Sequence, residues 1–262
     1  MELLSAISYV LVGITGAVFA NSTGAGGGVV FVPLFHQLGF TAAVAVATSF
    51  GIQSFGMTSG AIAWSRFARQ QPADSPWKML WPMVLLAVPF SVAGLWTVYL
   101  LDITPPAETL LSFSVFSLLL GIAILITSWR RSDAPPPTVL RRADVPAVIA
   151  IAYLGGIVTA WLSVGVGEFL AFYLILRRYD ATVAVAAAVI ITAISVWSVF
   201  IEHAFLTPEI SWAVVIFAGP GAVGGAVLAR MLAVHLGALR LKRFFGAWLI
   251  IIGLSELATR AL

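Results

Sequence analysis

The feature that most constrains this chain is a stretch of 63 residues, Leu3 to Ser65, without a single Asp, Glu, Lys or Arg. Charged residues make up only 10% of the whole sequence, against about 25% in soluble domains. Each later apolar run is long enough for an α-helix to cross a hydrocarbon core of about 30 Å. The sequence therefore predicts an all-α polytopic membrane protein. The later apolar runs are Met79–Leu101, Leu110–Trp129, Val145–Leu162, Ala181–Ile201 and Trp212–Ala229.

Composition and motifs argue against several classes of function. The chain has no cysteine, which excludes disulfides, Cys-ligated metals and thiol chemistry. Its net charge of +3 fits basic loops that set membrane topology better than a nucleic-acid surface. The sequence shows no paired carboxylates and no Ser/His/Asp or metal-spaced cluster inside the predicted membrane segments, and no phosphate-binding loop. We therefore expect no enzyme activity, no cofactor, no metal and no nucleic-acid partner.

Basic residues gather in four clusters that indicate topology. If all four are cytoplasmic, neighbouring clusters must be separated by an even number of crossings. Helix pairs over 79–101 and 107–129, and over 181–203 and 210–235, fit two of the three intervals. Their connections then face outward, and both chain termini lie outside. Only Glu2 precedes the first apolar stretch, so we expect no cleaved signal peptide. The clusters are Arg66, Arg69 and Lys78; Arg130, Arg131, Arg141 and Arg142; Arg177 and Arg178; and Arg240, Lys242 and Arg243.

Two segments predict broken hairpins rather than simple crossings. A helix over 145–162 is followed by the break "SVGVG" and a short arm over 168–178. At 1.5 Å per residue this arm is about 15 Å long, too short to span the membrane comfortably. We therefore expect a re-entrant pair that enters and leaves on the cytoplasmic side. The N-terminal region repeats this plan and opens to the outside, with helix 4–20, the break "NSTGAGGG", short arm 29–39 and helix 41–65.

The Pro- and Arg-rich linker 130–144 divides the chain into an N-terminal repeat, 1–129, and a C-terminal repeat, 145–262. A shift of 139 in the numbering superimposes three glycines, "AAVAVA" on "ATVAVA", and Gln53 on Thr192. A broken hairpin plus three spanning helices gives each half an odd number of crossings, so the halves have inverted orientation. Inverted repeats with interrupted segments are typical of secondary transporters. The glycine pairs are Gly16/Gly155, Gly26/Gly165 and Gly28/Gly167; a shift of 131 pairs Trp81/Trp212, Pro89/Pro220 and Gly94/Gly225.

The two breaks are the candidate substrate site. Irregular backbone at membrane depth is tolerated only where it is buried in protein or lines a cavity. The helices that start after the breaks present free N–H groups and positive dipole ends, which favour an anion. The alternative is that these glycines only allow close helix packing. The candidate residues are Asn21, Ser22, Thr23, Gly24, Gly26, Gly27 and Gly28 in the first break, and Ser163, Gly165 and Gly167 in the second.

Further side chains accompany the breaks. Glu168 is the one acidic residue predicted to lie deep in the membrane. It either relays protons or caps the helix that follows it, and the sequence leaves both roles open. We expect Gln53, Thr192 and Ser195 to line a central path, and Trp161 and Trp197 to wall its pocket. His36 and His203 are expected to be interfacial.

The motif "NSTGAGGGVVFVPLF", with "GFTAAVAVATSF" after it, resembles the TauE/SafE sulfite exporter family. The later segment "GGIVTAWLSVGVGEFLAFYLI" and the hydrophilic middle loop agree with this resemblance. It implies export of a small organosulfur anion, such as sulfite or a sulfonate, across the cell inner membrane. Alternating access, a channel-like anion pathway and a non-transporting membrane subunit all remain open. The expected partners are the anionic substrate and membrane lipid, and a homodimer is left open.

Overall fold

The computed structural model describes residues 3–105, 109–128 and 136–237, with positions 240, 243–244, 246–251 and 253–254 of the C-terminal segment. The described part is helical, which confirms the all-α prediction. Its helices are α1 (Leu3–Thr23), α2 (Gly28–Gln37), α3 (Ala42–Ala68), α4 (Leu80–Leu100), α5 (Thr109–Ser128), α6 (Val145–Leu162), α7 (Val166–Leu176), α8 (Ala181–Ile201) and α9 (Trp212–Leu236). Short turns precede α4 and α6, namely η1 (Pro76–Met79) and η2 (Arg142–Asp144), and a π-helical turn, η3 (Glu202–Leu206), extends α8.

Five helices in the described residues are long and apolar enough to cross a membrane, so the protein is a multi-pass membrane protein. They are built on α1, α4, α6, α8 and α9. Helix α3 is longer, with 27 residues, but it is too polar to be among the five. Its polar side chains, including Thr48, Ser49 and Gln53, are buried inside the protein. A polar helix can lie at membrane depth when its polar groups find partners in the protein interior.

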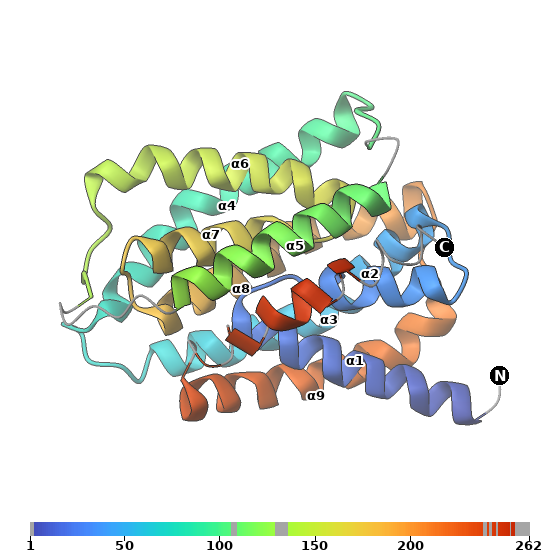
Figure 1. The fold of residues 1–262 in the computed structure, drawn as a ribbon, viewed down its shortest axis with the longest axis horizontal. Coiled ribbons are helices and arrows are strands. Elements are labelled where there is room, and N and C mark those ends of the chain that lie inside the picture. Colours follow the sequence, from blue (N-terminus) through green and yellow to red (C-terminus); the bar gives the residue numbers. More distant parts are fainter. Residues whose placement is uncertain are drawn as a thin grey trace.

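Two broken hairpins point at each other from opposite ends of the molecule (Figure 1). Helices α1 and α2 come from the end where the N-terminus lies, and α6 and α7 come from the other end. The first break covers Gly24–Gly27 and the second covers Ser163–Gly165. Both are shorter than the sequence predicted. Helix α1 continues three residues beyond position 20, and α7 starts at 166 rather than 168.

The α6–α7 hairpin is tied at its open end by Asp144. This buried carboxylate pairs with Arg177 Nε at 2.7 Å and accepts hydrogen bonds from the hydroxyls of Tyr173 and Tyr179. Burial, with the hydrogen bond to Asp144, raises the pKa of Tyr179, so its hydroxyl remains a donor at neutral pH. Since Asp144 precedes α6 and Arg177 follows α7, the hairpin returns to the end of the molecule from which it started.

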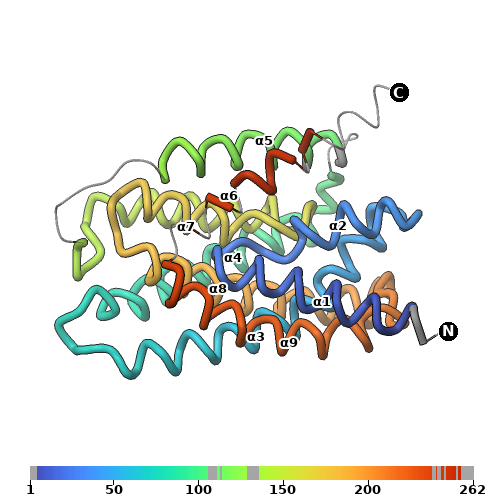
Figure 2. Tube along the Cα trace, turned by 60° about the horizontal axis from the view of Figure 1, so that its bottom comes forward, coloured from blue at the N-terminus to red at the C-terminus, as the bar shows by residue number. Residues whose placement is uncertain are grey.

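Helices of the N-terminal half pack against helices of the C-terminal half. Helix α1 lies along α9, and α6 lies along α4. Figure 2 shows α1 beside α9 from a second direction. A side chain at Gly225 would clash with the Ile14 carbonyl, and one at Gly94 would clash with the Tyr153 carbonyl. The two sequence shifts relate these contacts to each other, because they pair Gly94 with Gly225 and Ile14 with Tyr153. This is the packing that an internal repeat requires, while the inverted repeat itself stays a prediction.

Candidate functional site

The two breaks meet at the centre of the protein, where backbone touches backbone. A Cβ atom at Gly28 would clash with the Ser163 carbonyl, and one at Gly167 would clash with the Gly24 carbonyl. Only glycine permits this approach. The longer helices of the two hairpins, α1 and α6, end in the same backbone conformation. Gly24 after α1 has φ +78°, and Ser163 after α6, its counterpart under the shift of 139, has φ +58°. At Gly28 and Gly167 the structure shows the close packing that the sequence left as the alternative role of these glycines.

The carboxylate of Glu168 lies between the two breaks. One oxygen accepts a short hydrogen bond from the Gly26 N–H, and the other accepts from the Gly165 N–H at 2.8 Å. Gly26 and Gly165 are themselves related by the shift of 139. Glu168 is only 4% exposed, and Figure 1 shows that α7, which carries it, lies in the interior of the bundle. A single buried carboxylate therefore occupies the amide pair that the sequence assigned to an anion.

Gln53 makes a second link between the breaks. Its Oε1 accepts from the Gly27 N–H at 2.8 Å, and its Nε2 donates to Ser163 Oγ at 2.8 Å and to Ser49 Oγ at 3.0 Å. Ser163 Oγ in turn donates to Ser49 Oγ at 3.0 Å. All these side chains are buried. Sequence reasoning missed Ser49, although it precedes Gln53 by one helical turn and therefore shares its face.

Thr192 and Ser195 play different parts in the structure. Thr192 Oγ1 lies beside the backbone of Gly167, and it is buried without a hydrogen-bond partner among the described residues. Ser195 Oγ instead lies 2.6 Å from Ser91 Oγ and donates to the Ile191 carbonyl. Ser195 therefore joins α8 to α4 rather than reaching the breaks.

The side chains of Asn21, Ser22 and Thr23 bond within α1, and Thr23 Oγ1 also accepts from the Ala25 N–H of the first break at 3.2 Å. Asn21 Nδ2 donates to the Ala17 carbonyl at 3.0 Å, while Ser22 Oγ and Thr23 Oγ1 donate to the Phe19 carbonyl at 3.2 and 2.7 Å. These bonds to the preceding turn carry α1 past its predicted end. The three side chains lie next to the site without hydrogen bonds to Glu168 or Gln53 in the described structure.

The two candidate tryptophans lie outside this central network. Trp161 lines a cavity at one end of the protein, and its indole N–H donates to the Ile103 carbonyl at 3.2 Å. Trp197 is 47% exposed and donates to Thr58 Oγ1 at 2.6 Å on the flank of the bundle. Trp161 also packs against the apolar cluster that contains Ala25 of the first break and Val164 of the second, so its role as a pocket wall stays a prediction.

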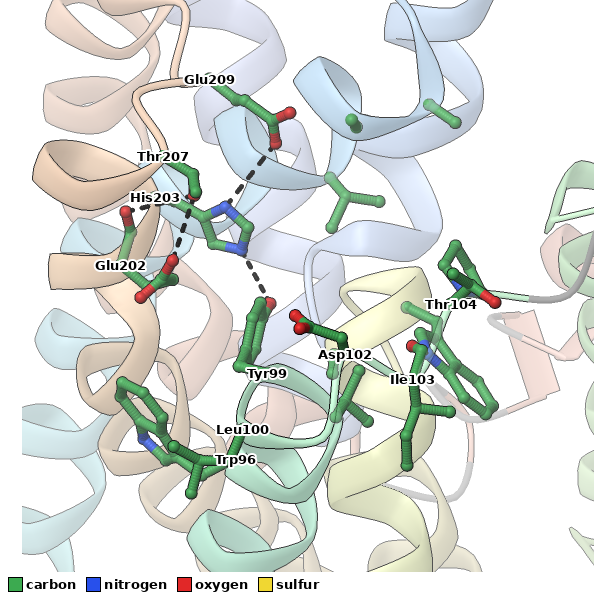
Figure 3. A pocket seen from close by; sticks show the side chains of 17 residues that line it. Trp96, Tyr99, Leu100, Asp102, Ile103, Thr104, Glu202, His203, Thr207 and Glu209 are labelled. Atoms are coloured by element: carbon green, nitrogen blue, oxygen red, sulfur yellow. Dashed lines mark hydrogen bonds and ion pairs between the residues drawn. The ribbon is translucent and has the colours of Figure 1, made fainter.

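The cavity lined by Trp161 has a volume of about 510 Å³, and its polar lining is acidic. We name it the end cavity. Asp102, Glu202 and Glu209 line it together with His203 and Tyr99 (Figure 3). His203 Nε2 lies 2.8 Å from the Tyr99 hydroxyl, and Nδ1 lies 4.0 Å from Glu209. His203 is 6% exposed because its ring faces the end cavity from the π-helical turn η3, and its place at the membrane interface stays a prediction.

The floor of the end cavity comes close to the central network. Val46 and Ala160 line the cavity, and each lies three residues before a network residue, Ser49 and Ser163 respectively. Three residues on a helix advance about 4.5 Å. Only about one helical turn of α3 and of α6 therefore separates the cavity floor from the network.

These features define a class: a polytopic membrane protein with a buried acidic side chain held between two opposed broken helices. The chain belongs to the family described as Sulfite exporter TauE/SafE, which it matches over residues 9–255. This confirms the resemblance drawn from the sequence motifs. Membership in this transporter family implies a membrane exporter of sulfite or related organosulfur anions. Searches of curated proteins and of solved structures gave no significant match.

Proposed function

We propose that the protein is a secondary exporter of a small organosulfur oxyanion, either sulfite or a sulfonate resembling sulfoacetate. Two oxygens of the substrate bind to the amides of Gly26 and Gly165, in the place that the Glu168 carboxylate occupies. The observation that carries this proposal is the pair of repeat-related amides, each donating to one oxygen of the same carboxylate. A sulfur oxyanion offers the same fork of two adjacent acceptor oxygens.

For an anion to bind here, the negatively charged Glu168 carboxylate must leave the amides of Gly26 and Gly165. The contacts that hold Glu168 and Gln53 between the breaks are made by backbone amides and hydroxyl groups. Two anions a few ångströms apart in a buried site repel each other strongly. The substrate therefore binds when Glu168 takes up a proton and releases the amides. Anion and proton then cross and leave together, Glu168 returns to the amides as a carboxylate, and export follows the outward gradient of the substrate.

The other site residues have supporting roles. Thr192 Oγ1, which lies beside Gly167 and is without a partner among the described residues, donates a hydrogen bond to the bound anion. Gln53 and Ser163 keep the two breaks in register while Glu168 moves. The remaining candidates, Gly24, Gly27, Gly28 and the Asn21–Thr23 turn, shape the backbone around the anion.

Alternating access uses the end cavity as the outer half of the path. The positive-inside rule places the clusters containing Arg66, Arg141 and Arg177 in the cytoplasm, and the acidic cavity outside. Carboxylates around an exit repel an anion that has left the centre, which disfavours its return. Release on the outer side then requires only that the turns ending at Ser49 and Ser163 separate.

The test is flux from the purified protein in liposomes. Sulfite, sulfoacetate and thiosulfate are compared with acetate as the carboxylate control. We expect saturable flux with counterflow for at least one sulfur oxyanion and none for acetate. Flux without saturation or counterflow indicates a channel, and no flux for any anion indicates a non-transporting subunit; either result contradicts the proposal.

Glu168→Gln separates coupling from binding. In this variant we expect proton-coupled net flux to fall at least about tenfold, while exchange of internal for external anion continues, because exchange needs no net proton movement. Loss of both net flux and exchange in a folded variant would show that Glu168 only caps helix α7.

A further inference from the structure

Two cavities flank the C-terminal part of α3 and lie apart from the central network. The first, which we name the lateral groove, has a volume of about 510 Å³ and lies between α3, α4 and α8. The second, the side cavity, has a volume of about 450 Å³ and lies between α3 and α9. Both are lined by Ile62 and Arg66. The two cavities therefore adjoin the same point on α3.

The lateral groove has apolar walls and a basic end. Ile62, Trp81, Ile194 and Trp197 line it, and each is between 42% and 47% exposed. It extends from Thr58 on α3 to Arg69 directly after it, and the eleven steps of 1.5 Å between these residues correspond to about 16 Å. One leaflet of a bilayer contributes about half of a 30 Å hydrocarbon core. The groove thus matches the depth of one leaflet and offers exposed apolar surface along that depth.

The arginines at this end lack acidic partners in the part of the chain that the structure describes. No ion pair joins Arg66, Arg69 or Arg230 to a carboxylate within the described residues. Arg230 Nε is buried in the side cavity and has no hydrogen-bond partner there among described residues. Its guanidinium lies 5.7 Å from the Phe67 ring centroid, which holds it against α3. A buried guanidinium N–H without an acceptor calls for an anionic group.

We propose that an acidic phospholipid binds at this end of α3. One acyl chain lies in the lateral groove, the phosphate contacts Arg66 and Arg69, and the head group extends into the side cavity toward Arg230. Basic pockets between membrane helices suit such head groups. A free sulfur oxyanion gains nothing from the apolar walls of the groove. This site is therefore distinct from the substrate site and does not depend on the proposed transport function.

Native mass spectrometry of the full chain in detergent tests this proposal. The probes are phosphatidylglycerol, phosphatidylcholine with the same acyl chains, and glycerol phosphate, which has no acyl chain. We expect phosphatidylglycerol to bind at least tenfold more tightly than phosphatidylcholine, and glycerol phosphate neither to bind nor to compete. Equal binding of the two lipids, or binding of glycerol phosphate alone, would overturn the acidic-lipid assignment.

Variants locate the site. Arg66→Gln combined with Arg69→Gln is expected to weaken phosphatidylglycerol binding about 30-fold, from about a fivefold loss per charge. Ile194→Trp, which fills the groove, is expected to weaken it with both arginines intact. The control is Arg142→Gln, which removes an exposed arginine outside both cavities. Unchanged affinity in both the double variant and Ile194→Trp contradicts the proposal, provided that thermal unfolding shows these variants to be folded.

Discussion

The two breaks occupy matching places in the two halves, yet they bring different chemistry to the centre. The first break supplies N–H donors from Gly26 and Gly27. The second supplies one N–H donor, from Gly165, and the acceptors of Glu168 and Ser163. The backbone plan is shared, whereas the side chains differ. Two similar backbone turns can therefore bind one side chain, Glu168, that only the C-terminal half supplies.

The asymmetry has a physical reason. The counterpart of Glu168 under the shift of 139 is Val29, which is fully packed in an apolar cluster. A second carboxylate at that place would face the first across the amide pair, and the repulsion would force one of them to stay protonated. One carboxylate satisfies both amides, so a single Glu168 is sufficient.

The largest expected effect comes from the backbone contact between the breaks. Gly28→Ala and Gly167→Ala each push a Cβ atom into a carbonyl of the opposite break. Such overpacking costs about 1–3 kcal/mol or more, and we expect a lower Tm and loss of flux. Gly224→Ala is the matched control, since open space surrounds Gly224. If all three variants unfold at the same temperature, the breaks are not in tight contact.

A somewhat smaller effect is expected for the side chain that joins the breaks. Gln53→Leu leaves the Gly27 N–H and the Ser163 hydroxyl without the carboxamide, and each unsatisfied buried group costs about 1–3 kcal/mol. Because Ser49 compensates in part, we expect a total of about 2 kcal/mol. Thermal unfolding in detergent measures it, with Gln71→Leu near the end of α3 as the control. A Gln53→Leu variant as stable as that control would show that Gln53 does not couple the halves.

Thr192 and Ser195 should differ in what they affect: Ser195 should affect stability, and Thr192 should affect binding of the anion. Ser195→Ala loses the bond to Ser91 and is expected to cost about 0.6–1 kcal/mol of stability with unchanged substrate affinity. Thr192→Val loses no hydrogen bond of the described structure and is expected to keep its stability but to bind the anion several-fold more weakly. Affinity and Tm are measured on both variants. The opposite pattern would exclude Thr192 from the site.

The smallest effect is expected at the end of α1. Ser22→Ala removes a bond that stays within the helix and should change stability by less than about 0.6 kcal/mol, while Thr23→Val also removes the acceptor of the Ala25 N–H and should cost somewhat more. We expect substrate affinity to stay within about twofold. A tenfold loss of affinity in either variant would show that these hydroxyls bind the substrate and that the first break contributes more to binding than the second.

The sequence predicted the architecture better than the chemistry. Apolar runs and glycine-rich interruptions located the helices and both breaks, because hydrophobic length and backbone freedom are local properties. The end of α1 was misplaced, since Asn21, Ser22 and Thr23 looked like loop residues. In the structure they bond to carbonyls of their own helix. Propensity alone does not tell which use such polar side chains will find.

The sequence did not predict that the Glu168 side chain lies between the two breaks. Glu168 was either a helix cap or a proton carrier, and its bond to Gly26 spans 142 residues of chain. The link from Gln53 to Ser163 spans 110 residues. Contacts this distant depend on how the halves dock. The burial of His203 could not be predicted for the same reason, because it depends on Tyr99 and on the π-helical turn at the end of α8.

The most direct test of the central claim is the number of protons taken up when a sulfonate binds. Calorimetric titrations in buffers of different ionisation enthalpy measure this number, and a sulfonate keeps its own charge throughout the pH range used. If the anion displaces the Glu168 carboxylate from the amides of Gly26 and Gly165, the wild-type protein takes up about one proton per anion and Glu168→Gln takes up none. No proton uptake by the wild-type protein, or equal uptake by both proteins, would contradict the account.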